Sequence, residues 1–226
     1  MKAMTRREFM ISGSVMVGTG ACFLAPGSGA FLAPKAHAAK VDFYEGKCGD
    51  EKNMGKRVLV VYASKYGSTG GVADAIGKEL CGKDVAVDVA LIKNAENIRS
   101  YQGVIIGSAI YMGKWMYEAT DFVKENRDVL CNVPVAYFLV GMTLAKNPEK
   151  RTDALSSIEP ILKAVPEIKP VGIGTFAGAM DYNNLSWINK KILKSKGTPE
   201  GDFRDWNVIR SWAMSLPLWL MGTQTT

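Results

Sequence analysis

The chain has 226 residues, of which 47% are hydrophobic and 22% are charged, and its formal net charge is +6 at pH 7. This length and composition suit one sizeable globular domain and exclude both a disordered chain and a polytopic membrane protein. The four cysteines include no Cys-x-x-Cys pair. That spacing argues against a disulfide scaffold, a structural zinc site and thioredoxin-type redox chemistry, so no metal site is predicted.

A pair of arginines lies near the start of the amino-terminal 38 residues. Arg6 and Arg7 precede an apolar, glycine-rich stretch, and Ala36-His37-Ala38 forms a small-x-small cleavage pattern. The segment resembles a twin-arginine export signal. The resemblance implies the twin-arginine export machinery as a partner and an exported protein, either periplasmic or at the extracytoplasmic membrane surface. An uncleaved signal that anchors the protein is the alternative.

Cleavage after Ala38 would change the charge and the cysteine count. It would remove four basic residues, one acidic residue and the one histidine, His37, which leaves a net charge near +3. No basic stripe with interleaved aromatic residues accompanies this mild charge, so no nucleic-acid partner is predicted. Cys48, Cys81 and Cys131 remain, and at least one of these thiols stays unpaired within the chain. We expect Cys81 and Cys131 to be buried as small apolar side chains.

From residue 57 onward, short apolar runs alternate with helical patterns. Residues 39–56 before them are polar and predict a weakly structured linker, so the domain spans residues 57–226. The apolar runs predict five strands, at residues 57–62, 85–92, 103–107, 133–140 and 171–176. Asp88 inside the second run favours an edge position for that strand.

Apolar residues at helical spacing predict helices between and after the strands. They lie at residues 72–80, 119–130, 155–165 and 206–216, with a bend at Pro160 in the third and a stop at Pro217 after the last. Repeated strand–helix alternation predicts an α/β fold in which helices cover both faces of a parallel sheet. Ligands of such sheets bind at the carboxyl ends of the strands, so the loops that follow the strands form the candidate site.

The loop after the first predicted strand has the composition of a phosphate site. It consists of Ser64, Lys65, Tyr66, Gly67, Ser68 and Thr69, and two further glycines follow. Hydroxyl groups and backbone N–H groups at a helix amino terminus bind phosphate, and the helix dipole assists them. The loop is neither a Walker loop nor a Gly-x-Gly-x-x-Gly motif. A plain glycine-rich turn is the alternative.

The loop after the third predicted strand suits a planar ring. It consists of Ser108, Ala109, Ile110, Tyr111, Met112, Gly113, Lys114 and Trp115. Flat and polarizable side chains beside backbone N–H groups form a wall for a ring system and its heteroatoms. Because both loops leave adjacent strands at the same edge, one ligand with a phosphate and a ring could occupy both, and FMN has that form. Ordinary packing by Tyr111 and Trp115 is the alternative.

Further segments carry a family resemblance, at residues 107–110, 113–115, 146–152 and 176–179. Together with the Ser64-x-x-Gly67-x-Thr69 loop, they are similar to the flavodoxin-domain family that includes menaquinone-dependent protoporphyrinogen IX dehydrogenases. The similarity covers roughly residues 57–215. It implies a flavodoxin-like three-layer sandwich whose five-stranded parallel sheet has the order 2-1-3-4-5. It also implies non-covalent FMN and electron transfer from a reduced substrate to quinone.

The resemblance also assigns roles to residues. It places Ser64, Gly67, Ser68 and Thr69 at the phosphate and residues 108–115 beside the isoalloxazine ring. It closes the other side of the ring with four consecutive residues, Val140, Gly141, Met142 and Thr143. Met112 stands where the dehydrogenases often have an aromatic residue.

Residues 183–196 combine Trp187 with four lysines and contain no acidic residue. A basic amphipathic helix with tryptophan predicts a contact with a membrane surface or an anionic substrate, and a solvated helix face is the alternative. Two functions remain open for the domain. One is an FMN-dependent dehydrogenase that uses quinone, and the other is an exported flavodoxin that carries electrons between redox proteins. A flavin-free binding module with this fold is a third alternative.

Overall fold

The structure is a computed structural model that describes residues 41, 43–49, 56–82, 85–147 and 149–216. The predicted export signal, His37 and Pro217 lie outside these residues. All described residues belong to one compact unit of the chain. None of the helices among them is both long enough and apolar enough to cross a membrane.

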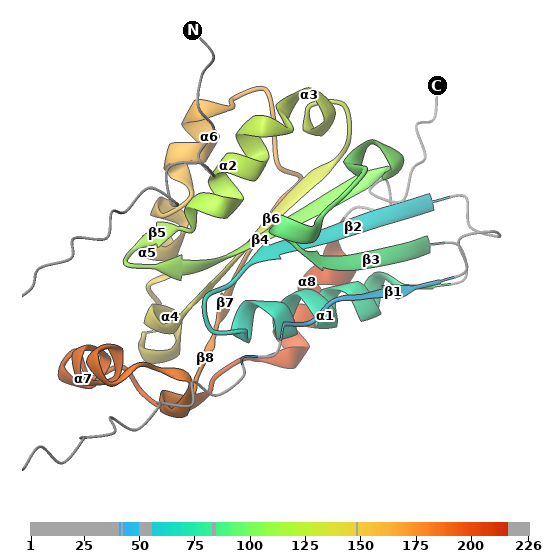
Figure 1. Ribbon diagram of the computed structural model, residues 1–226. Helices are drawn as coiled ribbons and strands as arrows, with labels where there is room; N and C mark the ends of the chain where they lie inside the picture. Colours follow the sequence, from blue (N-terminus) through green and yellow to red (C-terminus); the bar gives the residue numbers. More distant parts are fainter. Residues whose placement is uncertain (1–40, 42, 50–55, 83–84, 148, 217–226) are drawn as a thin grey trace, which may run out of the picture. The chain divides into compact units, whose positions relative to one another are not determined.

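A parallel sheet forms the centre of this unit (Figure 1). Its parallel strands are β2 (Lys56–Ala63), β3 (Val85–Leu91), β4 (Gly103–Tyr111), β6 (Val135–Gly141) and β7 (Gly172–Ala177). They lie in the order β3-β2-β4-β6-β7, so the parallel strands have the predicted order 2-1-3-4-5, but the whole sheet has seven strands rather than the predicted five. Ala63 at the end of β2 pairs with Ser108 in β4. The loops that follow these two strands therefore start as neighbours at one edge of the sheet.

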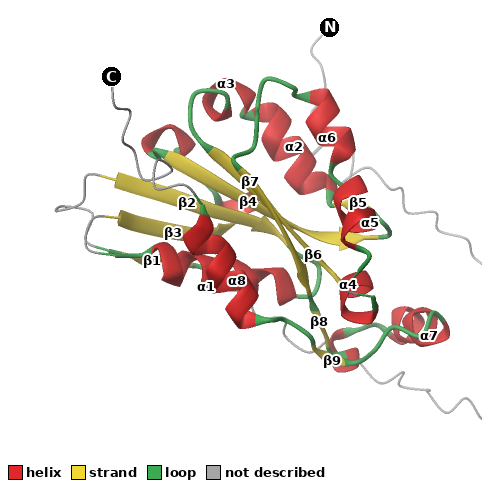
Figure 2. Ribbon diagram, turned by 180° about the vertical axis from the view of Figure 1, so that it is seen from behind, coloured by secondary structure: helices red, strands yellow, loops and turns green. Residues whose placement is uncertain are grey.

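Helices cover both faces of the sheet, as predicted (Figure 2). On one face, α1 (Ser68–Leu80) packs beside α8 (Trp206–Ser215). The other face carries four helices, α2 (Tyr117–Glu125), α3 (Arg127–Leu130), α5 (Arg151–Ser156) and α6 (Glu159–Ala164). The rim at the carboxyl ends of the strands carries α4 (Met142–Lys146), η3 (Tyr182–Asn184) and α7 (Trp187–Ser195).

The apolar sequence of β2 explains its central position. Val58, Val60 and Tyr62 face the core under α1 and α8, whereas Leu59 and Val61 face the opposite core, and all five are buried. A strand that is buried on both faces needs apolar side chains at consecutive positions. Each buried aliphatic side chain of this size stabilises the fold by about 1.5–3 kcal/mol.

One strand of the sheet lies inside the predicted linker. β1 (Gly46–Cys48) pairs antiparallel with β3, so the prediction of a weakly structured segment is wrong for these residues. The predicted edge position of the strand containing Asp88 is also wrong, because β3 lies between β1 and β2. A carboxylate is tolerated there because Arg57 Nη2 donates to Asp88 Oδ2 at 2.9 Å and the Tyr101 hydroxyl also donates to it.

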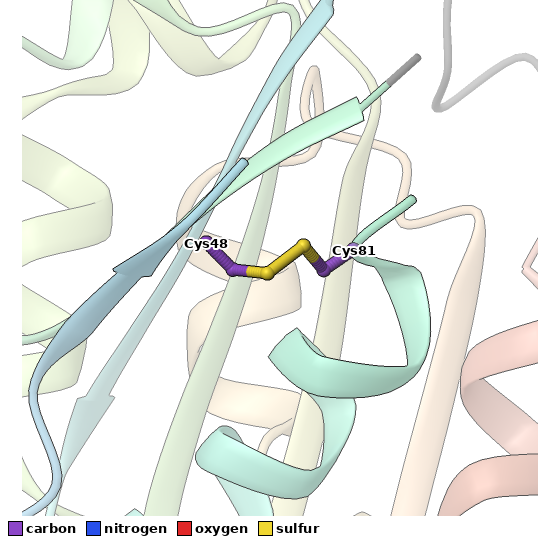
Figure 3. Close-up of a disulfide and its surroundings, with 2 residues drawn as sticks. All are labelled: Cys48 and Cys81. Atoms are coloured by element: carbon purple, nitrogen blue, oxygen red, sulfur yellow. A yellow bond between two sulfur atoms is a disulfide. The ribbon is translucent and has the colours of Figure 1, made fainter. Parts of the chain in front are cut away.

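A disulfide joins β1 to the end of α1 (Figure 3). Cys48 and Cys81 have their Cα atoms 6.0 Å apart and are separated by 33 positions in the sequence. Cys131 is a free cysteine with an exposed side chain. The prediction of apolar burial for Cys81 and Cys131 is therefore wrong, since Cys81 is cross-linked and Cys131 follows α3 at the surface.

Two predicted helices are each divided in two. The segment predicted at 119–130 breaks at Asn126, where the backbone leaves the helical region and the side-chain amide donates to Phe122 O at 2.9 Å. The segment predicted at 155–165 breaks before Pro160, which lies in the first turn of α6. Proline is tolerated there because the first-turn N–H groups have no intrahelical acceptor. The remaining short elements are β5 (Lys114–Trp115), β8 (Ala179–Met180), β9 (Gly201–Asp202), η1 (Ile92–Asn94) and η2 (Ile98–Ser100).

Candidate functional site

The loop between β2 and α1 has the geometry of an anion site. Gly67 lies in the left-handed region with a φ of 82°, which glycine adopts without strain. Its N–H donates to Ser64 Oγ at 3.0 Å, and its carbonyl accepts from Gly70 N–H at 2.9 Å. This tight turn leads into α1, whose first turn carries no acidic side chain. The free N–H groups and the dipole at this helix end favour a bound anion.

The side chain of Thr69 also indicates that an anion binds at this position. Its side chain is 0% exposed, and its Oγ1 has no hydrogen-bond partner among the described residues. A buried hydroxyl without a partner costs about 1–3 kcal/mol, so native structures rarely leave one without an acceptor. A phosphate oxygen at the start of α1 would satisfy this hydroxyl.

The loops after β2 and β4 touch each other. Lys65 Nζ lies 3.9 Å from the centroid of the Tyr111 ring and 5.8 Å from that of Tyr66. A hydrogen bond with Tyr111 raises the pKa of Lys65, so the ammonium group remains charged. The structure thus brings the two predicted loops together at one edge and places a positive charge between them.

The loop after β4 is a two-residue hairpin. Tyr111 pairs with Lys114 across it, and the two central residues, Met112 and Gly113, have φ angles of 53° and 76°. Hairpins of this type require positive φ at both central positions. For Met112 the conformation costs about 1–2 kcal/mol, and its side chain is 81% exposed at the tip. Such strain concentrates at ligand clamps.

The end of β6 lies beside β4, the first strand of this hairpin, and forms another wall of the site. At Gly141, a Cβ atom would lie 3.1 Å from Ile110 Cδ1. The absence of a side chain therefore lets Ile110 lie directly against the β6 backbone. Val140 and Gly141 are buried at the end of β6, and Met142 and Thr143 begin α4.

These three loops surround a pocket of about 460 Å³. Thirteen predicted site residues line the pocket: Ser64, Lys65, Tyr66, Ser68, Ala109, Ile110, Tyr111, Met112, Gly113, Val140, Gly141, Met142 and Thr143. Its lining is mainly apolar with a few convergent polar groups, as is typical of cofactor sites.

The remaining predicted residues lie elsewhere. Gly67 lines an adjoining hollow of about 490 Å³, and Thr69 is buried in the first turn of α1. Ser108 is buried, where its Oγ donates to Ala109 O and accepts from Met116 N–H. Lys114 is exposed on β5.

Trp115 is the clearest correction to the predicted ring wall. It is 6% exposed and packs edge-on against Tyr137, with ring centroids 5.3 Å apart. Pairing with Ile110 in the β4–β5 ladder turns its side chain toward the core rather than the pocket. Ordinary packing, the alternative noted for Trp115, is what the structure contains.

The sequence prediction missed one wall of the pocket. That wall consists of Gly178, Ala179, Met180, Asn189, Ile192, Leu193, Lys196 and Thr198. Asn189 Nδ2 donates to the Tyr66 hydroxyl at 3.1 Å, which ties α7 to the loop after β2. The amphipathic pattern of residues 183–196 was a usable signal, but it indicated a surface helix rather than a pocket wall.

A guanidinium group stands beside the phosphate loop. Arg204 Nη1 donates to Ser68 O at 3.4 Å and its side chain pairs with Asp202 at 2.6 Å. Hydrogen bonding from Arg204 lowers the pKa of Asp202, so this pair remains charged. A Cβ atom on Gly71 would lie 2.3 Å from Arg204 Nη1, so the guanidinium group would have to shift to make room for it. Arg204 therefore adds positive charge at the same end as Thr69.

A larger open hollow of about 1520 Å³ lies beside β3 and η2. Its walls include charged groups such as Asp88, Glu118 and Arg99. It contains none of the glycine-rich turns, and its walls reach from Arg57 near the start of β2 to η1 after β3, so it is not confined to the carboxyl ends of the strands, where ligands of such sheets bind. The smaller pocket is therefore the candidate site.

FMN fits the residues of that pocket. A phosphate oxygen would accept the hydrogen bond that Thr69 Oγ1 lacks at the start of α1. The apolar part of the pocket, between the β4–β5 hairpin and the end of β6, would take the flavin ring. The fold and the site define a flavodoxin-like, flavin-binding protein, and residues 59–205 match the flavodoxin domain family. The chain belongs to that family.

Two similar proteins carry the name protoporphyrinogen IX dehydrogenase (quinone). The one from Escherichia coli (strain K12) is 26% identical over 171 residues, which cover 71% of this chain and 94% of that protein. The one from Leishmania major is 25% identical over 177 residues, which cover 72% of this chain and 76% of that protein. Among solved structures, oxidised flavodoxin 2 from Bacillus cereus matches with a TM-score of 0.44 and 22% identity, over 71% of this chain and 97% of that one.

Proposed function

We propose that this protein is an FMN-dependent oxidoreductase that passes electrons from a reduced substrate of the protoporphyrinogen type to quinone. The observation that carries the flavin site is the buried Thr69 hydroxyl at the start of α1, which lacks a partner among the described residues and would find an acceptor in a phosphate oxygen. The names of the similar proteins support the reaction class and the quinone acceptor.

Each loop has one task in this proposal. Ser64, Gly67, Ser68 and Thr69 bind the phosphate, and Arg204 contributes charge beside them. The β4–β5 hairpin and residues 140–143 hold the ring from either side. Bound FMN would supply two-electron chemistry, in which a hydride and a proton leave the substrate and two electrons and two protons reduce a quinone to the quinol.

Lys65 sets the electrostatics of the pocket. Its ammonium group stays charged because the hydrogen bond with Tyr111 raises its pKa. A fixed positive charge beside a pocket favours negative charge on whatever is bound there. Backbone N–H groups at the ends of β4 and β6 act in the same direction on the ring.

We also propose that the chain is exported and works at an extracytoplasmic membrane surface, with residues 1–38 as its cleaved signal. Arg6 and Arg7 support the twin-arginine route. The Cys48–Cys81 disulfide supports an oxidising compartment, because such bonds are rare in the cytoplasm.

The surface of α7 supports a membrane contact. Trp187 is 76% exposed, Ile188 and Ile192 are exposed beside it, and lysines flank them. This combination of tryptophan, aliphatic and cationic side chains favours the interface of an anionic bilayer. Because Ile192 and Lys196 also line the pocket, a bilayer on this face would lie next to the opening that a membrane quinone must reach.

The test is a pair of spectral changes on purified flavoprotein. The absorbance band of oxidised flavin, at about 450 nm, should decrease when protoporphyrinogen IX is added without oxygen. It should return when menaquinone is added. Reduction only by a redox protein, with no response to protoporphyrinogen, would contradict the enzyme and favour an electron carrier.

A further inference from the structure

A short segment next to the phosphate loop precedes the part of the chain that matches the flavodoxin domain family. We call residues 43–48 the amino-terminal strap. Within it, β1 pairs with β3, and the Glu45 carboxylate accepts from Leu91 N–H and Asn94 Nδ2, each at 2.9 Å. β1 has only three residues, so its ladder is short, and the Cys48–Cys81 disulfide is the covalent attachment (Figure 3).

Tyr44 connects the strap to the phosphate loop through Tyr62. The Tyr62 hydroxyl donates to Tyr44 O at 2.9 Å. Burial raises the pKa of Tyr62, so this hydroxyl keeps its proton and remains a donor. A Cβ atom on Gly70 would lie 2.7 Å from the Tyr62 hydroxyl oxygen, so the Tyr62 ring supports the first turn of α1 directly.

The strap also borders the anion site from outside. Tyr44 lines the hollow of about 490 Å³ together with Gly67, Ser68 and Arg204. The same residue therefore touches the phosphate end of the site in two ways, as a wall of the adjoining hollow and through the Tyr62–Gly70 contact. Hydrogen-bond donors bind an anion well only when their positions are fixed in advance.

We propose that the strap is a positioning element for the phosphate loop, and that the Cys48–Cys81 disulfide holds it in place and thereby tightens the binding of a phosphate-bearing flavin. The inference rests on the proposed flavin binding. Forming the disulfide removes two electrons and two protons from the two thiols, and an oxidant that carries a disulfide takes them up by thiol–disulfide exchange.

The experiment compares FMN with riboflavin, which lacks the phosphate. Dissociation constants for both are measured by flavin fluorescence on the full chain in a Cys131→Ser background, before and after reduction and thiol blocking. The same titrations are made on Cys48→Ser/Cys81→Ser. We expect FMN to bind about tenfold more weakly without the disulfide, whereas the riboflavin constant changes by less than about twofold.

Tyr62→Phe isolates the connection itself, because it keeps the ring against Gly70 and removes only the hydrogen bond to Tyr44 O. It should weaken the binding of FMN and leave the binding of riboflavin unchanged. This variant also tests the proposal if the double cysteine variant fails to fold. Cys131→Ser alone should match the native chain, since Cys131 is exposed and forms no disulfide.

Two results with the variants overturn the inference. Equal weakening of both flavins would mean that the strap merely stabilises the fold, and unchanged FMN binding would mean that it does not act on the phosphate loop. A native chain that binds neither flavin would contradict the proposed function together with this inference. If the native chain binds both flavins, the proposed flavin binding stands, and the variants then test the role of the strap alone.

Discussion

Lys65 Nζ lies 3.9 Å from the centroid of the Tyr111 ring, so the loop after β2 and the loop after β4 are in direct contact. The two loops follow adjacent strands of the sheet, and the register Ala63–Ser108 sets them side by side. A cation over an aromatic face is attracted by the ring quadrupole. The contact therefore links the phosphate end of the pocket to its ring end.

Removal of this contact should reveal a coupling that depends on pH. In a double-mutant cycle of Lys65→Met and Tyr111→Leu, urea unfolding should give a coupling of about 0.5–1 kcal/mol. Because the pKa of Lys65 is raised from 10.5, this stabilisation is fully present below that value and is lost as the pH rises through the raised pKa. A cycle that pairs Tyr111→Leu with Lys124→Met, on α2, should show no coupling, and a pH-independent coupling for Lys65 would contradict the cation contact.

Thr69→Val removes one hydroxyl and nearly preserves the shape of the side chain. The flavin-free protein should be as stable as the native chain or more so, because the buried Oγ1 has no partner among the described residues. FMN should bind more weakly by about 1.5–3 kcal/mol, the value of a hydrogen bond to a charged group, and Ser64→Ala should weaken it further. Thr120→Val, whose Oγ1 donates to Met116 O within α2, is the matched control. Unchanged FMN affinity in Thr69→Val would remove Thr69 from the phosphate site.

Trp115 and Trp187 should respond in opposite ways to truncation. Trp115→Ala should lower the free energy of unfolding by about 3–5 kcal/mol, because the side chain fills the core beside Tyr137. Trp187→Ala should change it by less than about 0.5 kcal/mol, since the side chain is exposed on α7. In the milder Trp115→Phe variant, the absorbance spectrum of bound flavin should match that of the native chain. An altered flavin spectrum would instead place Trp115 against the ring.

Arg6→Lys with Arg7→Lys should keep the protein in the cytoplasm, because the export machinery reads the paired guanidinium groups. Cell fractionation measures the location. In the retained protein, a thiol reagent should label Cys48 and Cys81, which are joined in the structure, whereas exported protein should label at Cys131 alone among the three. Continued export of the double lysine variant would contradict the twin-arginine route.

The five parallel strands could be predicted because each contains a short run dominated by apolar residues, and in β2 and β6 that run is buried on both faces. β1 could not, since a Gly-Lys-Cys segment has no apolar pattern and gains its pairing only from the exposed edge of β3. The cysteine spacing did not identify a pair either, because Cys48 and Cys81 meet only after β1 is placed beside β3. The helix break at Asn126 arises from local hydrogen bonding that periodicity does not report, whereas the break before Pro160 was predicted as a bend from the proline itself.

The candidate site was predictable where it depends on sheet topology alone. Two loops after adjacent strands had to meet, and the Lys65–Tyr111 contact is the result. The orientation of Trp115 was not predictable, because it depends on the hairpin register that pairs it with Ile110. The α7 wall was missed because Asn189 reaches Tyr66 across 123 positions of sequence, a contact that no local pattern encodes.

The identity of the bound small molecule decides whether the pocket is a flavin site. Protein purified from the exported fraction is denatured, and the released small molecules are identified by mass and quantified against the protein. We predict FMN in a ratio of about one per chain, as expected for one site at a single switch point of the sheet. Protein that releases no flavin and takes up none when FMN is added would contradict the account.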